Sequence, residues 1–251
     1  MGEITKLVAN RQSNASAVTT ALEVHVKASA ADVSALLFPK GEPKHLTVEG
    51  LISALGQVLT AHAEAIGAAD RALADELGDD QAHRDARDSA RAEVRAALTD
   101  CQSSLSGAYG TSVVHAYALD GALPPSDNLL LQQARVVHTA LAKGGPKVAA
   151  RKGRKLDFAA LAEDLQVHIT AFDAALQNVK REEREAEQAL TKRDAAVAAF
   201  EPVYTGIADI AAGLLELVGQ SDLASRVKPT VRRRAGLDLP AEPTPDVPPA
   251  G

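Results

Sequence analysis

The sequence is poor in aromatic residues and in cysteine. Aromatic residues make up 3% of the 251 residues, tryptophan is missing, and Cys101 is the single cysteine. One cysteine excludes a disulfide within the chain and suits a reducing compartment. β-Sheets need runs of valine, isoleucine, threonine and aromatic residues to fill their faces, and few such runs occur here. The composition therefore argues against a β-sandwich and against an α/β enzyme.

Long apolar runs are also missing. No stretch of eighteen apolar residues occurs, which argues against a membrane-spanning segment. The first sixteen residues are polar and lack the apolar segment of a secretory signal. Lys6 stands where a myristoylation motif has serine or threonine. Together with a net charge of −6, these features predict a cytoplasmic protein with no overall field that favours nucleic acid.

Alanine is the most abundant residue, with 50 copies. It has the highest intrinsic helix propensity, and leucine, glutamate, arginine and glutamine, which supply much of the remainder, are also good helix formers. Small core side chains let helices approach closely and leave little room for deep pockets. The sequence therefore predicts an all-α fold, an elongated antiparallel bundle of five to seven helices.

The most regular apolar pattern runs from Phe158 to Tyr204. Apolar residues recur there at alternating steps of three and four, which places them along one narrow face of a helix. Such a row is the seam by which long helices pack side by side. Glu183 and Arg193 interrupt it, either because each meets an opposite charge on a neighbouring helix or, as we favour, because the segment 180–187 is solvated. The fourteen positions are Phe158, Ala162, Leu165, Ile169, Phe172, Leu176, Val179, Glu183, Ala186, Leu190, Arg193, Val197, Phe200 and Tyr204.

Helix-breaking and capping residues divide the chain into segments. Proline and glycine in 38–43 end a first helix that begins near Ala15, and Thr47 caps a second one. Gly78 and the two aspartates that follow predict a turn. Pro202 is expected to kink or restart the long helix, because it lacks an N–H and clashes with the preceding turn. The expected helices span about 15–37, 47–77, 81–109, 126–141, 157–201, 203–218 and 221–227.

The segments suggest two helical units, 15–120 and 121–234, after a flexible N-terminus, 1–14. Five of the seventeen residues in 235–251 are proline, and hardly any of the others are large and apolar. This composition predicts a disordered C-terminal tail with some polyproline II character.

A weak internal similarity links the two halves. Apolar and threonine positions in 46–65 recur in 156–175, and a tyrosine, leucine, serine and aspartate in 109–127 recur in 204–222. The similarity indicates either two tandem helical repeats or only the general likeness of alanine-rich amphipathic helices.

The sequence contains no motif for catalysis or for metal binding. A di-iron bundle needs Glu-x-x-His, which does not occur, and zinc, Walker and Gly-x-Ser-x-Gly motifs are missing too. Asp164 and His168 can share a helix face, but they lie at the edge of the apolar row and form a surface pair. Cys101 falls on an apolar row with Leu98, which is typical of a small core residue. We therefore expect no enzymatic activity, metal, cofactor or small-molecule substrate.

Two short segments are strongly basic, 143–155 and 228–234. If both lie at one end of the bundle, they form a positive surface on an acidic protein, which could hold phosphate groups of nucleic acid or anionic lipid. A charge run is most often a solvated loop, and no aromatic residue within 143–155 can stack on bases. The candidate anion-binding residues are Lys143, Lys147, Arg151, Lys152, Arg154, Lys155, Lys228, Arg232, Arg233 and Arg234.

The sequence thus predicts a non-catalytic structural or protein-interaction protein, a scaffold or adaptor that binds a protein partner or itself, in the second case through its long helix. The alternative is a weak, sequence-independent binder of nucleic acid or of an anionic membrane surface through the two basic segments. Salt separates these hypotheses, because polyanion binding falls steeply between low and moderate ionic strength.

Overall fold

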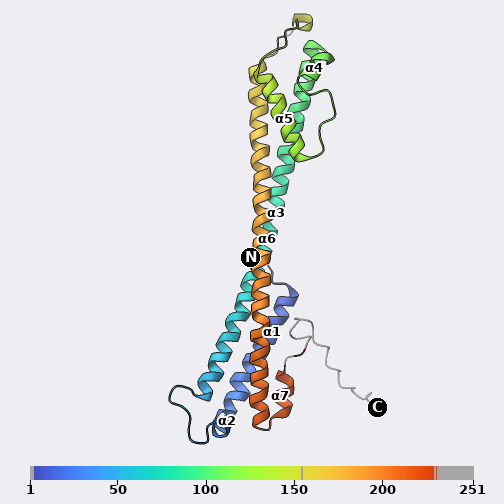
Figure 1. Cartoon of the computed structure of the whole chain (residues 1–251). Coiled ribbons are helices and arrows are strands. Elements are labelled where there is room, and N and C mark those ends of the chain that lie inside the picture. The colour runs from blue at the N-terminus through green and yellow to red at the C-terminus, as the bar shows by residue number, and fades with distance from the viewer. Residues whose placement is uncertain (1–2, 154, 229, 231–251) are drawn as a thin grey trace, which may run out of the picture. The chain divides into compact units, whose positions relative to one another are not determined.

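The computed structural model describes residues 3–153, 155–228 and 230. This part of the chain is mainly α-helix, with seven α-helices and no strand, which confirms the predicted all-α fold (Figure 1). The predicted disordered tail, 235–251, lies outside the described residues. The chain divides into two compact units, one made of residues 1–76 and 186–251 and the other of residues 77–185.

Two long helices, α3 and α6, contribute residues to both units. The other helices belong to one unit each, with α1, α2 and α7 in the first and α4 and α5 in the second. The α-helices are α1 (Lys6–Ala21), α2 (Ala30–Leu37), α3 (Val48–Tyr109), α4 (Thr111–Ala116), α5 (Asp127–Ala142), α6 (Phe158–Leu217) and α7 (Ser221–Val227).

This division differs from the two consecutive units, 15–120 and 121–234, that the sequence suggested. Each observed unit draws on both halves of the sequence, because α3 and α6 run through both units. The predicted turn at Gly78 is wrong, since α3 continues through it, and Pro202 lies inside α6. A glycine in a helix costs only about 1 kcal/mol relative to alanine. The Pro202 ring is exposed, while Phe200 and Tyr204 on either side are buried and hold the helix in place.

The first unit packs α1 and α2 against residues 48–76 of α3 and the last part of α6. Large apolar residues from all of these helices are buried in one core, including Leu22, Leu59, Ile66, Phe200 and Tyr204. The rings of Phe200 and Tyr204 stack with their centroids 5.6 Å apart. Each helix therefore turns one apolar face inward, as the periodicity predicts.

Helix α1 begins at Lys6, nine residues before the start expected from the sequence, so the prediction of a flexible segment 1–14 is wrong for its described part. Val8 is buried in the core of the first unit. The backbone N–H of Thr5 donates a hydrogen bond of 2.6 Å to Oδ2 of Asp70, a buried carboxylate on α3. A negative side chain is favourable there because the first N–H groups of a helix lack partners within it. This cap comes from a distant part of the chain, where sequence periodicity gives no sign of it.

A π-helical turn, Leu22–Val26, and a 3₁₀ turn, Lys27–Ser29, connect α1 to α2. The apolar spacing in 15–37 predicts that Val18, Leu22, Val26, Val33 and one of Leu36 and Leu37 face inward. The first four are buried, but both leucines are exposed. The expectation for the leucines is wrong, because the following residue, Phe38, packs against the core of the first unit instead.

The second unit packs α5 between residues 77–109 of α3 and residues 158–185 of α6. The predicted row of Val94, Leu98, Cys101 and Leu105 on α3 is buried. So are Leu165, Ile169, Phe172 and Leu176 of the α6 row, which confirms that prediction. Ion pairs join the helices at the surface, from Arg91 to Asp127 at 3.2 Å and from Arg135 to Asp173 at 2.9 Å.

The buried face of α6 changes position beyond Val179. Glu182 and Ala189 are buried, whereas the predicted Glu183 and Leu190 are exposed. The buried residues lie one position earlier than the row, and the row is buried again at Phe200 and Tyr204. Different helices pack on α6 in the two units, so the buried positions need not continue one row without a shift. The segment 180–187 is a continuous part of α6 and mostly exposed, as expected, with buried Glu182 as the exception. Farther along, Val197 is only half-buried.

By length and composition alone, α6 could cross a bilayer. Its most apolar window of eighteen residues has a mean hydropathy of 1.2, and 33% of that window is buried within the protein. The core helix of a soluble protein meets the same criterion. These values therefore do not assign a membrane span to α6.

Candidate functional site

The basic segment 143–155 connects α5 to α6 in the second unit (Figure 1). Lys143 lies at the C-terminus of α5, where a positive charge is favourable to the helix dipole. Lys147, Arg151 and Lys155 follow, and all four of these side chains are exposed. The side chain of Lys152 and the whole of Arg154 lie outside the described structure. The four side chains that are described are thus accessible to solvent, and their role in anion binding stays a prediction.

An aromatic cluster fixes the beginning of the basic segment. The hydroxyl of Tyr117 donates a hydrogen bond of 2.9 Å to the carbonyl oxygen of Gly144. The ring of Phe158 lies 5.9 Å from the ring of Tyr117 and 6.0 Å from that of Tyr109. Gly145 packs so closely on Phe158 that a Cβ there would lie 2.9 Å from the ring. The loop thus leaves α5 in a defined direction.

Sequence reasoning missed this cluster, because Tyr109 and Tyr117 lie far upstream of the basic segment. Tyr117 and Phe158 are buried, so these two rings hold the loop and do not offer faces to nucleic acid bases. Burial, together with the neighbouring Tyr109, raises the pKa of the Tyr117 phenol above its ordinary value. The phenol remains protonated at neutral pH and can keep donating to Gly144.

Of the second basic segment, 228–234, the structure describes one basic residue, Lys228, which belongs to the first unit. Lys228 follows the C-terminus of α7 and is exposed. Arg232, Arg233 and Arg234 lie outside the described residues. Lys228 and the described cations of 143–155 therefore belong to different units.

Cys101 has the properties of a core residue and not of a nucleophile. It is 3% exposed in the core of the second unit. Burial, with a smaller contribution from the charges of Asp164 and Asp100, raises the pKa of its thiol to about 11. The reactive form of cysteine is the thiolate, so this residue is inert at neutral pH.

An exposed histidine and aspartate form a close pair near α4. Nδ1 of His115 lies 2.6 Å from Oδ2 of Asp120, and this hydrogen bond lowers the pKa of the aspartate. Both side chains are largely in water. An ion pair in such a position contributes little energy because water screens it.

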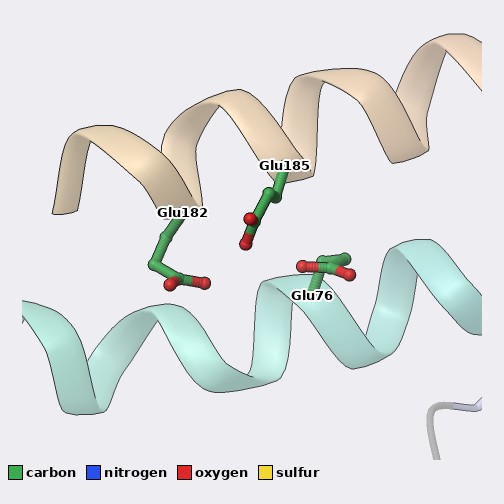
Figure 2. A group of neighbouring side chains, drawn as sticks. All are labelled: Glu76, Glu182 and Glu185. Atoms are coloured by element: carbon green, nitrogen blue, oxygen red, sulfur yellow. The ribbon is translucent and has the colours of Figure 1, made fainter. Parts of the chain in front are cut away.

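Acidic side chains on α6 point toward α3. Figure 2 shows Glu182 and Glu185 on α6 and Glu76 on α3. Glu76 belongs to the first unit and the other two belong to the second. Within the second unit, buried Glu182 already has nitrogen neighbours, with Nε2 of His83 at 3.4 Å and the guanidinium of Arg181 at 3.2 Å.

A small groove lies beside the π-helical turn in the first unit. It has a volume of about 230 Å³, and its lining includes His25, Tyr204 and Arg226. Pockets for drug-sized ligands usually measure about 300–1,000 Å³. The groove is therefore too small for a ligand of that size.

The chain matches no protein family model, no curated protein and no solved structure.

Proposed function

We propose that this protein is a non-catalytic structural protein that associates with a second copy of itself through one exposed face of α3. This proposal rests on a regular apolar row in the first unit. Its members recur at the 3-4 spacing by which helices pack side by side, but all of them are exposed. We call it the α3 row. Its members are Leu51, Ala54, Val58, Ala61, Ala65, Ala68 and Ala72.

The residues beside the α3 row favour a second copy as the partner. Glu64 and Arg71 lie seven residues apart, so they occupy the same edge of the row. In a two-fold symmetric pair, residue i of the first copy contacts residue j of the second, and residue j of the first contacts residue i of the second. Two antiparallel α3 helices can therefore place each Glu64 opposite Arg71 of the second copy. The alanines allow the two backbones to approach closely.

The chemistry of the described side chains supports a non-catalytic role. The Cys101 thiol is buried and protonated, and the His115–Asp120 pair is exposed to water. Efficient catalysis needs a nucleophile, a base and an orienting group that converge on one cavity. Neither of these two sites provides such a set.

Replacement of Val58 by glutamate tests the self-association. We expect sedimentation equilibrium to detect dimers of the wild-type protein and the Val58→Glu variant to dissociate at least about tenfold more readily, because the interface would bury an unpaired charge. Ile210→Glu is the matched control, since Ile210 on α6 is 43% exposed and Val58 is 46% exposed.

Charge reversal tests the contact between Glu64 of one copy and Arg71 of the other. Glu64→Arg should weaken association by placing like charges opposite each other, and the double variant Glu64→Arg, Arg71→Glu should restore it. A wild-type protein that is monomeric at all concentrations, or a double variant as weak as Glu64→Arg alone, would contradict the proposal.

The second candidate function is weak binding of polyanions through the segment 143–155. It is favoured by the four exposed cations on a loop whose start is fixed by Tyr117 and Phe158. Lys228 and the three arginines after it would add to this binding.

Fluorescence anisotropy with duplex DNA tests the polyanion hypothesis. The variant Lys147→Ala, Lys155→Ala should bind more weakly and show a salt dependence shallower by about two units in log K against log salt concentration, because each cation releases about one counterion. The control, Lys180→Ala, Lys192→Ala, has the same net charge, and it removes exposed lysines elsewhere on the chain. Equal losses in both variants would show a non-local charge effect and contradict a role for this loop.

A further inference from the structure

Three leucines surround the connection between α2 and α3 with their side chains in water. Leu36 is 59% exposed, Leu37 is 48% exposed and Leu46 is 46% exposed. Figure 1 shows this connection as a loop that projects past the end of α2 and the start of α3 within the first unit. We call residues 36–47 the α2–α3 turn. Leu36 and Leu37 end α2, and Leu46 lies ten residues after Leu36 on the same connection.

The α2–α3 turn is held in shape by its own backbone. The N–H of Phe38 donates to the carbonyl of Ser34 at 2.8 Å, and the N–H of Gly41 donates to the carbonyl of Phe38 at 2.9 Å. Gly41 has a φ of +100°, which glycine adopts without strain. The ring of Phe38 packs on the core of the first unit. Because the turn is already ordered, little conformational entropy is lost when it binds.

Two lysines of the turn extend into solvent. Lys40 and Lys44 are exposed and have no ion-pair partner among the residues that the structure describes. The acidic residue between them, Glu42, binds the start of α3, because its Oε1 accepts a hydrogen bond of 3.2 Å from the N–H of Val48. Glu42 and Glu49 thus lie at the N-terminus of α3, where the helix dipole offsets part of their negative charge. The projecting surface combines leucines with two free lysines.

We propose that the α2–α3 turn docks on an anionic lipid surface. The leucines enter the boundary between headgroups and acyl chains, and the ammonium groups of Lys40 and Lys44 hold headgroup phosphates. A bilayer fits better than a protein partner, because the leucines stand on a projecting turn. A deformable planar surface accepts a convex shape without needing a complementary groove. The α2–α3 turn ends before the α3 row begins at Leu51, so this proposal does not depend on the proposed self-association.

Flotation with lipid vesicles tests this proposal. The full-length protein should float with vesicles of phosphatidylcholine and phosphatidylserine and bind much less to phosphatidylcholine alone. The variant Lys40→Ala, Lys44→Ala should lose about 30-fold in affinity for the anionic vesicles, from about 1 kcal/mol per lysine. The variant Leu36→Ser, Leu37→Ser, Leu46→Ser should lose binding to both kinds of vesicle.

The control variant is Leu129→Ser, Val136→Ser, which changes two similarly exposed residues on α5. It should float like the wild type, and circular dichroism should show the same helix content in every variant. The proposal is overturned if the wild type ignores anionic vesicles or if the leucine variant floats unchanged. It is also overturned if Lys147→Ala, Lys155→Ala alone abolishes flotation, or if the leucines affect only association between copies of the protein.

Discussion

Replacing Phe172 by alanine should destabilise the protein by about 3–5 kcal/mol. Phe172 is 0% exposed and lies in the core of the second unit, among leucines and isoleucine from α3, α5 and α6. The substitution removes a large buried ring and leaves a cavity that rigid helices fill only in part. The free energy of unfolding, measured by urea titration, should fall by this amount.

Val167→Ala provides the control on the same helix. Val167 lies five residues before Phe172, and its side chain is 63% exposed. Its replacement should change the free energy of unfolding by less than about 0.5 kcal/mol. If Phe172→Ala cost less than about 1 kcal/mol, the α6 row would face water, and the core described for the second unit would be wrong.

Replacing Leu59 by alanine should destabilise the first unit by about 2–5 kcal/mol. Leu59 on α3 is fully buried in the other core, which includes Leu22 and Tyr204. Hydrogen exchange, read by mass spectrometry, should show the greatest loss of protection in α1 and in the last part of α6. This location distinguishes the effect from that of Phe172→Ala, which should appear in α5 and the first part of α6.

The matched control for Leu59 is Leu7→Ala, which removes the same atoms from an exposed position on α1. We expect it to lower stability by less than about 0.5 kcal/mol. Similar losses for the two leucine variants would mean that burial does not determine the effect and would contradict the core of the first unit.

Local patterns in the sequence were sufficient to locate most of the helices. Aspartate is a typical N-cap residue, and Oδ1 of Asp157 accepts a hydrogen bond of 3.0 Å from the N–H of Ala160 at the start of α6. The row around Cys101 on α3 and the row from Phe158 to Val179 on α6 are both buried. These predictions succeeded because caps and apolar spacing act within one or two turns of a helix.

The candidate site was predictable only as a list of charges. The sequence gives six cations in 143–155, but not the hydrogen bond from Tyr117 or the packing of Phe158 that fix the loop. Those contacts join residues more than twenty-five positions apart. Similarly, spacing placed either Leu36 or Leu37 inward, whereas Phe38 packs on the core and both leucines are exposed.

The sequence by itself determined that this protein is helical, because alanine content and the 3-4 spacing act locally on every turn. The tertiary structure decided where helices end and which residues share a core. Gly78 and Pro202 are local helix breakers, yet α3 and α6 continue through them. Gly78 costs only about 1 kcal/mol, so α3 continues through it although no described side chain in 71–93 is buried. The penalty of about 3 kcal/mol at Pro202 is outweighed because Phe200 and Tyr204 on either side are buried in the core of the first unit. That balance depends on residues distant in the chain, so no single segment of the sequence contains it.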